Sequence, residues 1–124
     1  VEEPETIASA IRIGDPVSWK AAEAARDESG GAIGSVTDEE IVDAYKLLAA
    51  TEGVFAEPAS AVSVAGLKKL AAGGVIEKGA TVVCTLTGHG LKDPETAIES
   101  SAQPRRIKPD IGAALDAMGL EEGR

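Results

Sequence analysis

The chain has 124 residues, a formal net charge of −9 and a single cysteine, Cys84. The negative charge makes nucleic acids and anionic membrane surfaces poor partners, because both are polyanions. No apolar run approaches the roughly 20 residues that a membrane span requires. A lone cysteine without a basic and apolar leader favours a reducing, cytoplasmic location.

Aromatic residues make up only 2% of the chain, so its core must be built from aliphatic side chains. Such a core suits a parallel sheet better than a β-sandwich. The first helix is expected to begin at Asp15-Pro16, where Asp caps and Pro tolerates the first helical position, and to end at Gly30-Gly31. Residues 37–40 form a capping box that opens a second helix, and Gly53 ends it.

A third helix is expected from near Pro58 to Gly73-Gly74, and a last one over residues 111–118. Between them, residues 81–86 form an unbroken β-branched run, typical of a strand buried on both faces. Residues 32–36 and 53–56 are weaker strand candidates. This alternation predicts an α/β fold, part of a doubly wound, mostly parallel sheet flanked by helices.

The segment after the predicted strand is a candidate ligand site. In open parallel sheets, ligands bind beyond the carboxyl ends of the strands. Gly88 and Gly90 flank His89 there and let the backbone approach a ligand closely, while Thr87 can point its hydroxyl into the crevice. The residues alone indicate a small-molecule site at a strand end, with a plain strand-to-helix turn as an equal alternative.

Three segments resemble the threonine synthase family, in the family's own order. T-L-T-G-H-G-L-K-D-P, residues 85–94, is similar to its C-terminal signature. T-I-A-S-A-I-R-I-G-D-P-V-S-W, residues 6–19, and G-V-F-A-E-P-A-S-A, residues 53–61, resemble two earlier stretches. The resemblance covers nearly the whole chain and fades after about Pro94.

The resemblance implies a pyridoxal-phosphate (PLP) enzyme of fold type II that converts O-phosphohomoserine and water to threonine and phosphate. It implies that residues 1–94 are the C-terminal part of the PLP-binding domain and residues 95–124 a C-terminal helical extension. The expected partners are the upstream part of the same polypeptide, O-phosphohomoserine and a second subunit in a homodimer.

The resemblance also assigns cofactor-binding residues. Thr87 matches a hydroxyl that contacts the pyridine nitrogen of PLP, with Gly88 beside it. A hydroxyl there pairs with a largely neutral ring, whereas a carboxylate would hold a proton on the nitrogen. Ala10 and Ile11 match a segment against the face of the ring. Glu57 matches a carboxylate beside the cofactor, at a helix start where negative charge is stabilised.

Each assignment has a structural alternative. Thr87 could cap the following helix, and Glu57 could be an ordinary helix-start acid. His89 is expected to shape its loop through its ring N–H rather than to transfer protons. Cys84 is expected in the core, and Lys92-Asp93 is expected to be a surface pair that opens a helix. Arg12 has two equal interpretations, a contact with a substrate or cofactor phosphate and a structural ion pair.

The family's catalytic Schiff-base lysine has no counterpart here, and no metal site is predicted. Ser18-Trp19-Lys20 mimics the lysine motif, but Lys20 belongs to the A-I-R-I-G block. The chain alone is therefore expected to be inactive. The alternatives are another fold type II PLP enzyme, such as a threonine dehydratase or a cysteate synthase-like enzyme, and a standalone, non-catalytic binding module.

Overall fold

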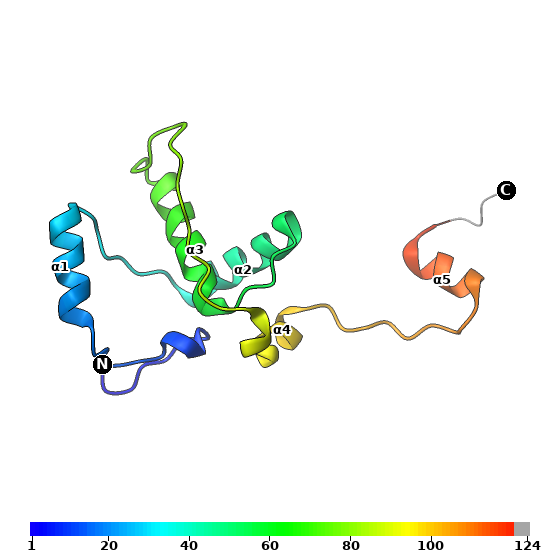
Figure 1. The fold of residues 1–124 in the computed structure, drawn as a ribbon. Helices are drawn as coiled ribbons and strands as arrows, with labels where there is room; N and C mark the ends of the chain where they lie inside the picture. The colour runs from blue at the N-terminus through cyan, green and yellow to red at the C-terminus, as the bar shows by residue number, and fades with distance from the viewer. Residues whose placement is uncertain (121–124) are drawn as a thin grey trace.

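The computed structural model describes residues 1–120, and the last four residues of the predicted extension, 121–124, lie outside the described part. Two helices cross at the centre, with a short 3-10 turn below them, while the first and last α-helices stand apart (Figure 1). The last one follows a long extended segment. The elements are η1 (Ser9–Ile11), α1 (Trp19–Ser29), α2 (Asp38–Glu52), α3 (Pro58–Ala72), η2 (Gly90–Lys92), α4 (Pro94–Ser100) and α5 (Ile111–Met118).

The predicted capping box opens α2. Thr37 Oγ1 accepts a hydrogen bond from the Glu40 N–H at 3.2 Å, and Glu40 Oε2 accepts one from the Thr37 N–H at 2.7 Å. Two backbone donors that a helix start leaves unpaired are thereby satisfied. Gly53 ends the helix in the left-handed conformation, with φ 66°, which glycine adopts without steric cost.

Helix α1 begins three residues later than the sequence predicts, so the expected start at Asp15-Pro16 is wrong. Residues 16–18 form a turn in which the Trp19 N–H donates to the Pro16 carbonyl at 3.2 Å. Ser18 is the N-cap, and its side chain makes no capping bond. A good cap pattern permits a helix start but does not fix it where no packing supports the first turn. The end at Gly30 is confirmed.

The core lies between α2, α3 and the segment that leads into η1. Pro58 occupies the first turn of α3, and the helix ends at Gly73, both as predicted. Most buried core side chains are small, so α2 and α3 approach each other closely. The core cluster consists of Ala8, Ile41, Ala44, Tyr45, Leu48, Ala61 and Ala65.

The predicted sheet is not formed within residues 1–120. Residues 81–86 are free of helix but pair with no strand in this part of the chain, and residues 32–36 likewise form no strand. A single antiparallel bridge joins Ala56 to His89. Backbone N–H and C=O groups make a strand only when a neighbouring chain segment accepts and donates. Val83 is 86% exposed, so the run predicted as buried on both faces lacks its covering layers.

Of the predictions for the C-terminal region, the last helix is confirmed. Helix α5 spans the predicted residues 111–118, capped by Asp110, whose side chain accepts from the Ala113 N–H at 2.8 Å. The division into domains at Pro94 stays a prediction. None of the helices described in residues 1–120 is long and apolar enough to cross a membrane.

Candidate functional site

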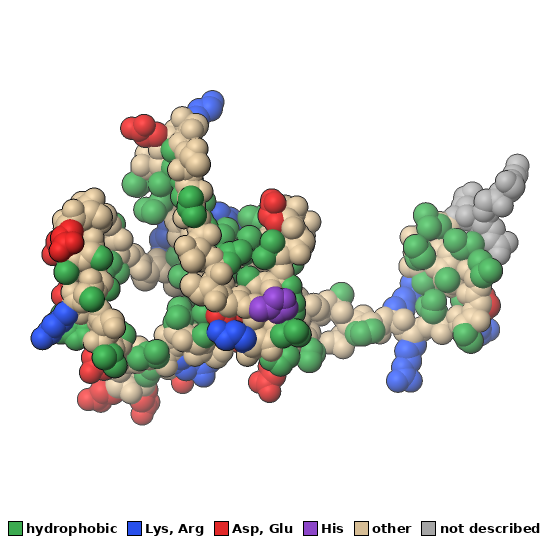
Figure 2. Space-filling view, in the orientation of Figure 1, with side chains coloured by type: hydrophobic (Ala, Val, Ile, Leu, Met, Phe, Trp, Pro, Cys, Tyr) green, Lys and Arg blue, Asp and Glu red, His purple; other side chains and the backbone are tan. Residues whose placement is uncertain are grey.

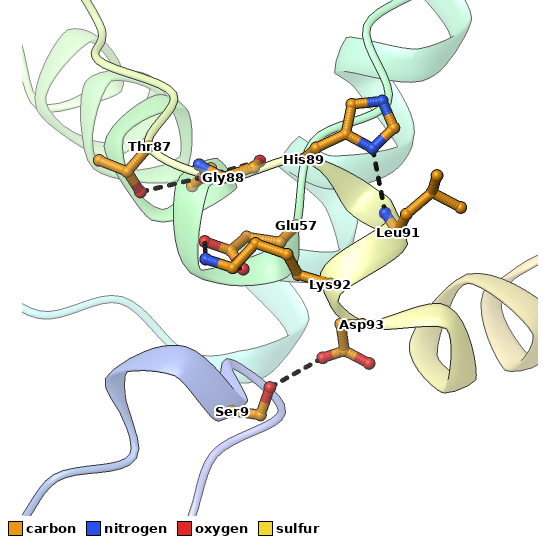
Figure 3. Close-up of polar contacts among 9 residues, drawn as sticks. Ser9, Glu57, Thr87, Gly88, His89, Leu91, Lys92 and Asp93 are labelled. Carbon is orange, nitrogen blue, oxygen red and sulfur yellow. Dashed lines mark hydrogen bonds and ion pairs between the residues drawn. The ribbon is translucent and has the colours of Figure 1, made fainter.

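The loop from Thr87 to Asp93 lies against the start of α3, so two of the three family-like segments meet (Figure 3). The Glu57 N–H donates to the Gly88 carbonyl, and the Gly90 N–H donates to the Phe55 carbonyl, each at 3.0 Å. These backbone bonds flank the Ala56–His89 bridge. They hold residues 87–90 in register with residues 55–57.

Close approach explains both glycines in this loop. A Cβ on Gly88 would overlap the carboxylate of Glu57, and a Cβ on Gly90 would overlap the ring of Phe55. A Cβ at either position would displace the neighbouring side chain or the loop itself. The sequence argument placed the close approach at a ligand, whereas the structure places it, for both glycines, at side chains of the same chain.

The Thr87 hydroxyl contacts a buried serine of α3. Ser60 is 1% exposed, and its Oγ lies 3.1 Å from Thr87 Oγ1. The Gly88 N–H donates to Ser60 Oγ at 2.7 Å, and Ser60 Oγ lies 3.2 Å from the Gly88 carbonyl oxygen. Thr87 itself is exposed and caps no helix, so the capping alternative is wrong.

Glu57 carries a buried negative charge next to Gly88. Its side chain is 5% exposed, and Lys92 Nζ lies 3.2 Å from Oε1 and Oε2 alike. Glu57 precedes α3 as its N-cap residue but makes no side-chain capping bond, unlike an ordinary helix-start acid. A carboxylate removed from water needs a charged or hydrogen-bonding partner, and Lys92 supplies it. The cation itself is 60% exposed, so solvent weakens the pair.

Asp93 links the loop to the N-terminal segment. Its Oδ2 accepts from Ser9 Oγ at 3.1 Å, and its Oδ1 accepts from the Thr96 N–H at 3.2 Å, capping α4. Burial raises the pKa of Asp93, but hydrogen bonds from Thr96 and Ser9 and the charge of Arg12 outweigh it and lower that pKa below 3.8. Asp93 thus opens a helix, as predicted, and Lys92 is exposed, but each of the two residues also fastens the loop to a different segment.

His89 shapes the loop, as expected, but through an accepting ring nitrogen and not through its ring N–H. Its Nδ1 accepts a hydrogen bond from the Leu91 N–H at 3.2 Å and thereby caps η2, so the ring N–H is not the group used. The ring also meets Phe55 edge-on, with centroids 5.4 Å apart.

Ala10 and Ile11 lie on η1 and are exposed. Ile11, 50% exposed, borders a cavity of about 660 Å³ beside α3. Thr87 is not part of that cavity. Its lining comprises Thr6, Ile11, Ala32, Gly34, Ser35, Val36, Ile41, Val62, Gly66, Lys69 and Leu70. The structure thus gathers Glu57, Thr87 and Gly88, and ties Ala10 and Ile11 to them through their neighbour Ser9.

The other candidates have structural roles. Arg12 donates from Nε to the Thr6 carbonyl at 2.9 Å, so it braces its own segment. Cys84 is only half-buried, with Sγ 3.7 Å from the Ser63 carbonyl oxygen, so its predicted place in the core is wrong. Lys20 Nζ lies 5.4 Å from the Trp19 ring centre on α1, away from the loop.

Sequence reasoning missed Ser9 and Ser60 as members of the site, and it missed the contacts that Lys92 and Asp93 make with other segments. Ser9 and Ser60 stand inside the family-like segments, but nothing in their spacing shows that they meet residues 84 and 27 positions away. No cluster of three metal-binding side chains occurs in residues 1–120. Gly30 and Gly73 end helices, as predicted, rather than cradle a phosphate.

Comparison with known proteins gives a consistent result. A family model described as pyridoxal-phosphate dependent enzyme matches residues 1–88. A threonine synthase of Halalkalibacterium halodurans is 60% identical over 117 residues, which are 94% of this chain and 33% of that protein. Threonine synthases of Mycobacterium leprae and Methanocaldococcus jannaschii are 52% and 57% identical over 97% and 87% of the chain. The chain spans 33% and 27% of their lengths, and it corresponds to the C-terminal portion of such relatives.

Proposed function

Because the chain belongs to the family of pyridoxal-phosphate-dependent enzymes, we propose that it is the C-terminal part of a threonine synthase. The complete enzyme converts O-phosphohomoserine and water to threonine and phosphate. The chain's part is to supply one wall of the cofactor site, at the ring nitrogen. It acts with the upstream part of the same polypeptide, in a cytoplasmic homodimer.

The observation that carries this proposal is the placement of Thr87. The residue is exposed, and its hydroxyl oxygen lies 3.1 Å from the buried Ser60 hydroxyl. A neutral pyridine nitrogen accepts one hydrogen bond, and a hydroxyl can donate it without adding charge. The donor present at this position therefore fits the ring nitrogen of PLP.

Three further groups fit the same cofactor. Gly88 lets the loop next to Thr87 lie directly against the Glu57 carboxylate. Glu57 places a carboxylate under the loop, with Lys92 balancing its charge. Ala10 and Ile11 provide an apolar surface, suited to the face of an aromatic ring, on a segment that Asp93 holds near the loop. When bound, PLP supplies an electron sink for the substrate, and these residues orient its ring.

The lysine that would hold the cofactor covalently lies, on this proposal, outside residues 1–124. Lys20 is a poor substitute, because it stands on α1 beside the Trp19 ring and not at the loop. Covalent catalysis of this kind requires an amine next to the reacting carbon. The 124-residue chain by itself should therefore not turn over O-phosphohomoserine.

The extended segment at residues 81–86 also supports the proposal that this chain is part of a longer polypeptide. Residues 81–86 have the composition of an internal parallel strand but no neighbour within the described residues. In the complete protein, strands from the remaining part would pair on both sides of it and form the doubly wound sheet. Thr87 would then stand at the carboxyl end of that strand, where ligands of such sheets bind.

The test is an assay of the complete polypeptide that contains this chain, loaded with PLP. Incubation with O-phosphohomoserine should release threonine and phosphate in equal amounts. Thr87→Val should lower the turnover roughly tenfold through loss of one hydrogen bond, whereas Thr85→Val, two residues earlier, should change it less.

If the assay yields other products, one of the alternative functions replaces threonine synthesis. Deamination of threonine to 2-oxobutyrate would make the enzyme a threonine dehydratase. Formation of cysteate from O-phosphoserine and sulfite would make it a cysteate synthase. Failure to bind PLP at all would favour a non-catalytic binding module.

A further inference from the structure

Ser60 occupies a position in the site that none of the functions above explains. It lies in the first turn of α3, is 1% exposed, and contacts three polar atoms of the loop. It accepts from the Gly88 N–H at 2.7 Å, and its oxygen lies 3.1 Å from Thr87 Oγ1 and 3.2 Å from the Gly88 carbonyl oxygen. A buried hydroxyl so placed has one proton, which it can donate either to Thr87 or to the Gly88 carbonyl.

The hydrogen bond between Ser60 Oγ and Thr87 Oγ1 can have either hydroxyl as its donor, so two arrangements keep it. Ser60 has one hydroxyl proton and Thr87 has one, while the Gly88 N–H donates to Ser60 in both. In the first arrangement, Thr87 donates to Ser60, and Ser60 donates to the Gly88 carbonyl. In the second, Ser60 donates to Thr87 instead of to the Gly88 carbonyl, and the Thr87 proton is free to point outward. Only the second keeps the bond between the two hydroxyls and leaves Thr87 able to donate to a ligand.

We infer that Ser60 is a positioning residue that turns the Thr87 hydroxyl into an outward-pointing donor for an acceptor nitrogen of the ligand. The inference rests on the proposed function, because it takes the ring nitrogen of PLP as that acceptor. The resulting chain runs from the Gly88 N–H to Ser60, from Ser60 to Thr87 and from Thr87 to the ligand. Each donor in such a chain polarises the next, so the last bond is strengthened.

No other described residue makes a hydrogen bond to the Thr87 hydroxyl within residues 1–120. Without Ser60, this exposed side chain would be free to rotate between its staggered positions, and its donor would no longer be held toward the ligand. The helix would also lose its bond to the Gly88 N–H. If Ser60 had only a structural role, its removal would cost the bond to the Gly88 N–H but would not change the orientation of the Thr87 hydroxyl.

Ser63 provides a matched control one turn later in α3. Its Oγ lies 3.0 Å from the Ser60 carbonyl oxygen and 3.3 Å from the Thr85 carbonyl oxygen, so it too ties the helix to the extended segment. It makes no contact with the Thr87 hydroxyl. Ser63→Ala therefore removes a tether of the same kind without disturbing the proton chain.

The experiment uses the complete polypeptide reconstituted with PLP labelled with ¹⁵N in the ring. The ¹⁵N resonance reports the hydrogen bond to the ring nitrogen, and a titration gives the dissociation constant for PLP. Four variants are compared with the parent protein: Ser60→Ala, Ser63→Ala, Thr87→Val and the double variant with Ser60→Ala and Thr87→Val. Circular dichroism checks that each is folded.

In Ser60→Ala, the ¹⁵N resonance should move toward its position in Thr87→Val, and PLP should bind about two- to tenfold more weakly. Ser63→Ala should leave the resonance in place. In the Thr87→Val background, Ser60→Ala should cause no further movement of the resonance, because the two residues act through one bond. If Ser60→Ala does not fold, Ser60→Cys keeps the volume with a weaker donor and should shift the resonance in the same direction.

The inference is overturned if PLP binds and the ¹⁵N resonance of Ser60→Ala matches that of the parent protein. It is equally overturned if Ser60→Ala moves the resonance by the same amount in both backgrounds. Either result would leave the proposed function standing. Failure of the parent protein to bind PLP would instead remove the proposed function, and the inference with it.

Discussion

At the scale of single residues, the site depends on one loop that is held to α3 at several points. Gly88 sits where the loop passes over the Glu57 carboxylate, and Lys92 returns to the same carboxylate from the far end of the loop. Asp93 continues the chain of contacts to Ser9. Each contact is modest, but together they hold the loop, with Thr87 at its start, against the beginning of α3.

Gly88→Ala should displace the loop and destabilise the chain. The added Cβ would overlap the Glu57 carboxylate, and inserting a carbon into a filled space costs about 1–3 kcal/mol. Urea unfolding followed by circular dichroism measures the loss. Gly66→Ala is the control, because a Cβ there meets no atom within 4 Å, and alanine in the middle of a helix should raise stability by roughly 0.5–1 kcal/mol. Equal effects of the two substitutions would contradict the close approach at Gly88.

At the scale of elements, the stability of α2 should depend on pH through Glu40. The bond from the Thr37 N–H is the main cause that lowers the pKa of Glu40 from 4.5, with Lys69 assisting and burial opposing. A lowered pKa in the folded state means that the ionised carboxylate favours folding. That contribution is complete above pH 4.5 and is lost as the pH falls through the folded-state pKa.

Glu40→Gln should therefore reduce the free energy of unfolding most at neutral pH, and the difference from the parent chain should shrink as the pH falls below 4.5. Urea unfolding at a series of pH values measures this difference. Glu39→Gln removes a charge from the same turn without breaking the bond to Thr37, so its effect should be smaller. A Glu40→Gln difference that stays constant across the pH range would contradict the assignment.

Element ends were predictable where a local pattern decides them. The Thr37–Glu40 box and Pro58 open their helices, and Gly53 ends one, because the needed partners lie within a few residues. The start of α1 was not predictable, since a cap at Asp15 needs packing to support it. The strand at residues 81–86 needs partners that residues 1–120 do not provide, so the pattern alone does not form it.

In the site, too, features set by local sequence were predictable and contacts between distant residues were not. Thr87, Gly88 and Glu57 come together where the loop after residues 81–86 meets the start of α3, and the family-like wording identifies both segments. The contribution of Ser60 depends on a contact across 27 positions of sequence, which no local spacing encodes. The roles of these residues toward a cofactor stay predictions.

At the scale of the whole molecule, the structure is open, with much apolar surface uncovered. Figure 2 shows hydrophobic side chains over the outer surfaces of the central helices and of the separate C-terminal helix. Val83 and Ile111 are 86% and 76% exposed, and Leu91 is 74% exposed. Exposed apolar surface of this extent normally meets a partner. A chain covering a third of its relatives' length is expected to leave such faces to the remaining part.

The isolated chain should therefore self-associate at high concentration, which light scattering can measure. Val83→Lys should weaken the association, because a charge on an unpaired extended segment opposes pairing between copies. Val17→Lys is the control, since Val17 is fully exposed on the turn before α1, outside that segment. A stable monomer at high concentration would contradict the view that these faces require a partner.

The most direct test of the central claim is the location of the lysine that binds the cofactor. The complete polypeptide is incubated with PLP, reduced with borohydride, and digested, and the pyridoxyl-lysine is located by peptide mass. The account predicts one stoichiometric adduct, on a lysine outside residues 1–124, and none when this chain is treated alone. A stoichiometric adduct on Lys20, or on any other lysine of this chain, would contradict the claim that it supplies only the ring-nitrogen wall.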